Sequence, residues 1–80
     1  MISGLQIRAA KAFLRWSSAD IADAANVGVT TVRRFELEDG VPQGNMRIIL
    51  KIISAFEEAG IEFIGTPDDG PGVRLKPKSD

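Results

Sequence analysis

The stretch SSADIADAANVGVTTVRRFE, residues 17–36, decides the fold of this chain. It predicts two short helices, over residues 17–25 and about 29–37, joined by a tight turn. Ser17 can cap the first helix, because a serine hydroxyl accepts from the backbone N–H groups two or three residues further on. Asn26 tolerates the left-handed conformation that ends a helix, and Gly28 can begin the next one.

The second of these helices has two different sides. Helical spacing places Val32, Phe35 and Glu36 on one of them. The other side carries Val29, Thr30, Arg33, Arg34 and Leu37. A short helix that buries two apolar residues and turns arginine and threonine outward fits the major groove of DNA.

Together the two helices resemble the helix-turn-helix of the lambda-repressor-like (XRE) family of bacterial and phage regulators. The matching residues are Ser17, Ala22, Val27, Val32, Phe35 and Glu36. The resemblance covers about residues 5–60 and implies a small four-helix DNA-binding domain. Two residues depart from the family, which usually has glutamine at the position of Ser18 and glycine at the position of Asn26.

The resemblance also implies which residues contact double-stranded DNA. They are Ser17, Ser18, Val29, Thr30, Thr31, Arg33 and Arg34. Arginine can bind guanine O6 and N7 or clamp a phosphate, so Arg33, Arg34 and Thr30 are expected to supply most of the base reading. In the family a basic residue at the position of Lys11 pairs with the acid at Glu36, so these two are expected to form a structural pair. Lysine keeps the charge but lacks the bidentate fork of arginine, which predicts a weaker tie.

Composition narrows the possible functions. The chain has 80 residues, enough for one small domain, and neither cysteine nor histidine, which excludes disulfides and the usual zinc, thiol and imidazole chemistry. No nucleophile–base constellation, phosphate-cradling glycine loop, metal cluster or cofactor motif is visible, so an enzyme is not expected. The N-terminus has no signal-peptide pattern and no apolar run could span a bilayer, which predicts a cytoplasmic protein without a membrane partner.

Charge is unevenly distributed along the chain. Residues 1–34 hold five basic and two acidic residues, residues 35–72 two basic and eight acidic, and residues 73–80 three basic and one acidic. The net charge is −1 overall. A basic patch beside the recognition helix can attract DNA locally even when the total is slightly negative.

Three further segments complete the expected architecture. A helix over residues 5–16 should bury Leu5, Ala9, Ala12, Phe13 and Trp16 and expose Arg8, Lys11 and Arg15. A helix over about 46–59, capped by Asn45, should bury Ile49, Ile52, Ile53 and Phe56. Residues 61–64 and 73–76 alternate as strands do, and the eight residues between them are expected to form a loop too long for a tight hairpin turn.

The helix over 46–59 has a wider apolar face than a small core requires, with Ile48, Met46 and Leu50 on its flanks. The C-terminal segment or a second subunit must cover it. A two-fold dimer is therefore expected, with Phe63 as its anchor. The expected interface residues are Ile48, Leu50, Ile61, Phe63, Val73 and Leu75.

The sequence thus predicts one mostly α domain over residues 1–80, a four-helix lambda-repressor-like domain with a C-terminal β-hairpin. The expected function is transcription regulation, as a repressor that binds a palindromic operator as a homodimer. The alternative is a protein-interaction module of the same fold, antitoxin-like or anti-regulator, that does not rely on DNA. The acidic second half favours the alternative, and the basic first half favours DNA binding.

Overall fold

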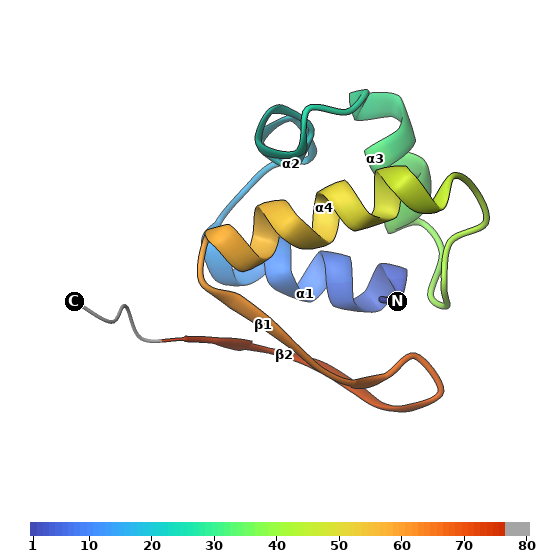
Figure 1. The fold of residues 1–80 in the computed structure, drawn as a ribbon, viewed down its shortest axis with the longest axis vertical. Coiled ribbons are helices and arrows are strands. Elements are labelled where there is room, and N and C mark those ends of the chain that lie inside the picture. The colour runs from blue at the N-terminus through green and yellow to red at the C-terminus, as the bar shows by residue number, and fades with distance from the viewer. Residues whose placement is uncertain (77–80) are drawn as a thin grey trace.

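The computed structural model describes residues 1–76, which form four helices followed by a two-stranded antiparallel hairpin (Figure 1). The helices are α1 (Gly4–Leu14), α2 (Ser18–Ala25), α3 (Val29–Glu36) and α4 (Met46–Glu58), and the strands are β1 (Ile61–Thr66) and β2 (Asp69–Leu75). The mostly helical class, the number of helices and the hairpin agree with the sequence prediction. The sequence also predicts a tail at residues 77–80, which lie outside the described residues.

The core lies where α1, α2, α3 and α4 meet above the hairpin. Its largest fully buried side chains are Phe35, Phe56, Ile7, Ile21, Ile52, Ile61 and Val32. Around Phe56 the packing is aromatic: the Trp16 ring stacks on it at 5.5 Å, and the Phe63 ring meets it edge-on at 5.9 Å. These contacts join the segment just after α1, the end of α4 and the start of the hairpin.

The predicted helix over 5–16 differs from α1 in its bounds and in its buried face. A capping box begins α1 one residue earlier: Gln6 N donates to Ser3 Oγ at 3.2 Å, and Ser3 N donates to Gln6 Oε1 at 2.9 Å. Arg15, with φ 56°, ends the helix in the left-handed conformation. Trp16 is therefore outside the helix.

The predicted buried stripe of this helix was wrong at Leu5 and Phe13, whereas Trp16 packs against the core as expected. Ile7 and Ala10 are fully buried, whereas Leu5 is 47% exposed and Phe13 51% exposed. Both stripes are apolar at helical spacing, so periodicity alone could not choose between them. The sequence pattern indicates a frayed end at residues 1–4, but the structure holds residues 2–4 in place: Ile2 is 3% exposed, and Gly4 N donates to Gly40 O at 2.9 Å.

The hairpin is longer and tighter than predicted. Thr66 pairs with Asp69, which leaves Pro67 and Asp68 as a two-residue turn, so the expected long loop is absent. A register shift between Ile64 and Thr66 accommodates one extra residue on β2. Gly65 (φ 72°) and Gly70 (φ 63°) make this possible, because residues with side chains rarely adopt such angles.

One buried amide ties the hairpin to α1. Gln6 Nε2 donates to the carbonyl oxygens of Gly72 at 3.1 Å and Ile64 at 3.3 Å, while its Oε1 serves the α1 cap. In addition, β2 packs on α1 and β1 packs on α4. An isolated hairpin is marginal in water, and these contacts are what hold it. No helix within residues 1–76 is long and apolar enough to cross a bilayer.

Candidate nucleic-acid interface

The outward side of α3 carries the side chains expected to read DNA. Thr30, Arg33 and Arg34 are exposed, and Val29 and Thr31 are half-buried. Val32 and Phe35 are 0% exposed, which fixes the rotation of α3 about its own axis. Because these two anchors cannot turn outward, the arginines and Thr30 must face solvent.

The turn before α3 has the expected geometry. Asn26 adopts the left-handed conformation (φ 56°, ψ 52°) and its N–H donates to the last turn of α2. Gly28 is the extended N-cap residue of α3, and within residues 1–76 no side chain caps the beginning of that helix. A Cβ added at Gly28 would meet nothing within 4 Å. In the described part of the chain, the beginning of α3 is therefore open, with N–H donors that no side chain caps.

The two serines at the start of α2 make hydrogen bonds to other groups of the same chain. Ser17 Oγ accepts from Asp20 N at 3.1 Å, and Ser17 N donates to Asp20 Oδ2 at 2.8 Å, which confirms the predicted cap. This arrangement sets the Asp20 carboxylate at the start of α2, where it would repel a phosphate. Ser18 Oγ donates to Glu36 Oε2. Both serines thus serve the fold, and they are poorer candidates for DNA contact than the residues of α3.

Arg33 and Arg34 have different surroundings. The Arg34 guanidinium lies over the Phe35 ring, 5.2 Å from its centroid, and within 3.4 Å of where a Cβ at Gly44 would be. It is therefore steadied by α3 and the loop before α4. Arg33 borders an open hollow of about 520 Å³ between α1, α2 and α3. Its other lining residues are Arg8, Lys11, Ser18, Glu36 and Leu37.

A polar junction beneath this hollow holds α3 against α1. Lys11 Nζ lies 2.5 Å from Glu36 Oε1, so the predicted pair is in contact. No hydrogen bond with good geometry reaches Oε1 within residues 1–76, and the Lys11 charge is what compensates that buried oxygen. With Ser18 on the other oxygen, the carboxylate joins three helices.

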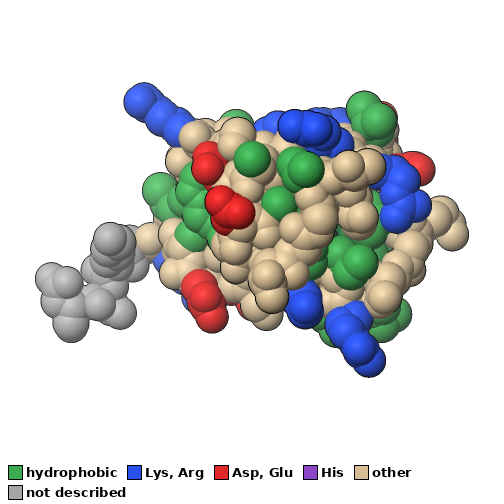
Figure 2. Space-filling view, turned by 90° about the horizontal axis from the view of Figure 1, so that it is seen from above, with side chains coloured by type: hydrophobic (Ala, Val, Ile, Leu, Met, Phe, Trp, Pro, Cys, Tyr) green, Lys and Arg blue, Asp and Glu red, His purple; other side chains and the backbone are tan. Residues whose placement is uncertain are grey.

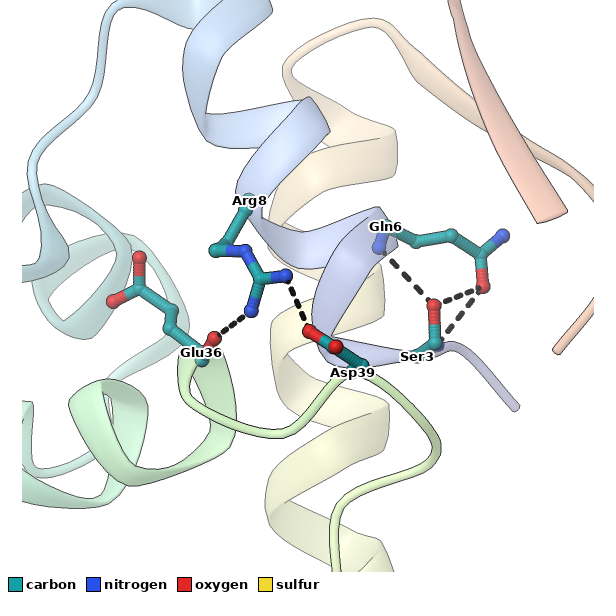
Figure 3. A network of polar contacts seen from close by, with 5 residues as sticks. All are labelled: Ser3, Gln6, Arg8, Glu36 and Asp39. Atoms are coloured by element: carbon teal, nitrogen blue, oxygen red, sulfur yellow. Dashed lines mark hydrogen bonds and ion pairs between the residues drawn. The ribbon is translucent and has the colours of Figure 1, made fainter.

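Arg8 has a structural role that the sequence analysis did not identify. Its Nη1 donates to the backbone carbonyl of Glu36, and its Nη2 lies 2.7 Å from Asp39 Oδ1 (Figure 3). Arg8 therefore satisfies a carbonyl at the end of α3 and holds the following loop. The Asp39 carboxylate thereby turns toward α1. One signal was available: Arg8 lies one turn before Lys11, on the same side of the helix.

Charge is also asymmetric on the surface. Within residues 1–76, ion pairs engage Arg8, Lys11 and Arg74, and none engages Arg33 or Arg34. Figure 2 views the molecule from above, the side of α2 and α3, and shows acidic side chains mostly near the C-terminal end and basic ones mostly elsewhere around the rim. The basic side chains on α3 are thus available to an anionic partner.

The residues predicted for a dimer interface do not form one exposed surface. Ile61 is 1% exposed and belongs to the core, so its place in the interface was wrong. Ile48, Phe63 and Val73 are half-buried against the core, and Phe63 already packs on Phe56. Leu50 and Leu75 are half exposed. The hairpin thus covers part of the apolar face of α4 within one chain, while Met46 (60% exposed) and Leu50 (50% exposed) on one flank stay exposed.

No protein-family model, curated protein or solved structure matches the chain significantly. The lambda-repressor-like resemblance accordingly rests on the sequence pattern alone.

Proposed function

We propose that this protein is a sequence-specific DNA-binding regulator with a lambda-repressor-like domain, which represses transcription by occupying a palindromic operator as a homodimer. The observation that carries the proposal is the outward face of α3, where Thr30, Arg33 and Arg34 are exposed on a helix anchored by two fully buried side chains. Because α3 is already fixed in the domain by Val32 and Phe35, little conformational entropy is lost when it binds.

Each part of this face has a role in the proposal. The α3 helix would enter the major groove, with Arg34 and Thr30 on base edges and Arg33 on a base or phosphate. The open N–H groups at the start of α3 would donate to the DNA backbone. Catalysis, a cofactor and a metal have no part in it. Acting on DNA would place the protein in the compartment that holds the genome, which in this proposal is the cytoplasm.

The deciding experiment is selection of bound sequences from a random pool of duplex DNA, followed by titration of the enriched sequence over a range of salt concentrations. We expect one palindrome to be enriched, with half-sites about one helical turn, roughly 34 Å, apart. Affinity should fall steeply with salt, since about one counterion is released per phosphate contact. Absence of enrichment together with absence of binding at about 50 mM salt would reject the proposal.

A protein-interaction module remains the second candidate, and two observations favour it. Asp20 lies at the start of α2, where DNA phosphates would approach. A groove of about 380 Å³ between α2 and α4 is lined by apolar and charged side chains, including Leu50, Arg47 and Glu58. Tight binding to another protein, with no DNA binding at low salt, would establish this alternative.

A further inference from the structure

An apolar strip on α1 is left uncovered by the fold. We define the α1 strip as Leu5, Ala9, Ala12 and Phe13, the residues on the side of α1 that the sequence pattern marked for burial. Leu5 is 47% and Phe13 51% exposed; Ala12 is exposed and Ala9 half-buried. Large aromatic and aliphatic side chains exposed along one helix face are typical of an interaction surface.

The hairpin extends this surface. Phe13 lies about two turns beyond Gln6 on the same side of α1, and Gln6 contacts β2 at Gly72. Figure 1 shows α1 and β2 running in the same direction, and the two elements are in contact, so β2 follows α1 toward the C-terminal end of that helix. Leu75 is 46% exposed. The α1 strip and the end of β2 thus lie on one side of the molecule.

The order of side-chain sizes along the α1 strip indicates its occupant. Leu5, Ala9 and Phe13 are spaced four residues apart and read large, small, large. If two copies of α1 cross antiparallel with the two-fold axis at Ala9, each Leu5 meets the partner's Phe13, and the two alanines meet at the centre. Small central residues allow the axes to approach to about 8 Å. The strip is therefore complementary to itself, as an interface with two-fold symmetry requires.

Charge is compatible with this arrangement. α1 has no acidic residue, so two unpaired copies would repel each other. However, Arg8 pairs with Asp39 and Lys11 with Glu36. Arg15 lies past the end of α1, and an antiparallel crossing sets the two copies of Arg15 at opposite ends of the interface. Little like-charge repulsion therefore remains at its centre.

We infer that a second copy of this chain docks on the α1 strip, with the two α1 helices antiparallel across a two-fold axis at Ala9. This inference rests on the proposed function in one respect, which is that an operator with two half-sites requires a dimer. The α1 interface takes the place of the interface that the sequence predicted on α4 and the hairpin.

The chain has no cysteine, so single introduced cysteines report the geometry directly. We expect Ala9→Cys to form a covalent dimer under mild oxidation at micromolar concentration, because two copies of residue 9 face each other across the axis. Leu5→Cys should not crosslink, because its two copies lie at opposite ends of the interface. Ala24→Cys, at an exposed site on α2, is the control. Crosslinking of Leu5→Cys or Ala24→Cys above Ala9→Cys would overturn the inference.

Charge exchange tests the pairing of Leu5 with the partner's Phe13. Leu5→Glu and Phe13→Lys should each raise the dimer dissociation constant by about tenfold or more. The double variant should recover dimerisation, because the new charges pair across the axis at both ends. Both sites are exposed in one chain, and circular dichroism should show that folding is retained. A monomer at high micromolar concentration, or no recovery in the double variant, would refute the inference.

DNA measurements on the same variants separate this inference from the proposed function. If the wild-type chain crosslinks through Ala9→Cys but binds no DNA, the interface stands and the proposed function fails. If an operator is enriched while the cysteine and charge variants behave as the wild type, the function stands and the α1 interface fails.

Discussion

Lys11 Nζ lies 2.5 Å from Glu36 Oε1, across the contact between α1 and the end of α3. The Glu36 side chain is 8% exposed and that of Lys11 30%, so water screens the acid little. Ser18 donates to the second carboxylate oxygen. The position of the outward face of α3 relative to the rest of the domain therefore depends on a partly buried polar junction as well as on apolar packing.

Removing either charge of this junction should destabilise the protein. Glu36→Gln leaves the Lys11 charge unpaired, and Lys11→Met leaves the carboxylate without compensation, so we expect about 1–3 kcal/mol of lost unfolding free energy for each. The double variant should lose less than the two together. Urea denaturation measures all three. The exposed pair Glu62–Arg74 is the control, and Glu62→Gln should cost within about 0.5 kcal/mol. Additive losses at Lys11 and Glu36 would show that the contact carries no coupling.

The buried amide of Gln6 should be necessary for a stable hairpin. Gln6→Leu removes the donor to the carbonyls of Ile64 and Gly72 and the acceptor in the α1 cap, which should cost about 1–3 kcal/mol. Amide hydrogen exchange should speed up most in β1 and β2. Gln43→Leu, at an exposed loop position, is the matched control. If protection in the hairpin is unchanged in Gln6→Leu, its attachment lies elsewhere.

Two glycines at helix starts should differ in how far alanine destabilises the protein. At Gly4 a Cβ would lie 1.6 Å from the Glu38 carbonyl oxygen, so the backbone must move, and we expect a loss of about 1–3 kcal/mol or more. At Gly28 a Cβ meets nothing within 4 Å and φ is −73°, so the change should stay within about 0.5 kcal/mol. Thermal melts of the two variants give the comparison. Equal losses would contradict the close approach of α1 to the loop after α3.

Arg34→Ala should weaken specific DNA binding far more than it affects folding. We expect a loss of about 1–3 kcal/mol in operator binding, the value of one good base contact. Stability should fall by only about 0.5–1 kcal/mol, from the lost contact with the Phe35 ring. Lys76→Ala removes the same charge near the C-terminus and serves as the control in titrations of operator and of unrelated duplex. Operator affinity equal to that of the wild type would remove Arg34 from the proposed site.

The local elements of this protein were determined by its sequence. The caps at Ser17 and Asn45 and the left-handed Asn26 depend on a side chain and a few neighbouring residues, and all three are in the structure as predicted. The buried face of α3 followed from spacing within the helix. The contact of Lys11 with Glu36 is long-range, and it was expected only through the family resemblance.

Tertiary structure decided what depends on distant partners. α1 has two apolar stripes, and the stripe with Ile7 and Ala10 is buried because Arg8 and Lys11 reach the end of α3 while Gln6 reaches the hairpin. The hairpin turn is tighter than the sequence predicted, because Gly65 and Gly70 can adopt positive φ and because the strands are held on α1 and α4. Helix periodicity is a property of neighbouring residues, whereas these contacts join residues 25 to 66 positions apart, so only the folded chain could choose between the patterns.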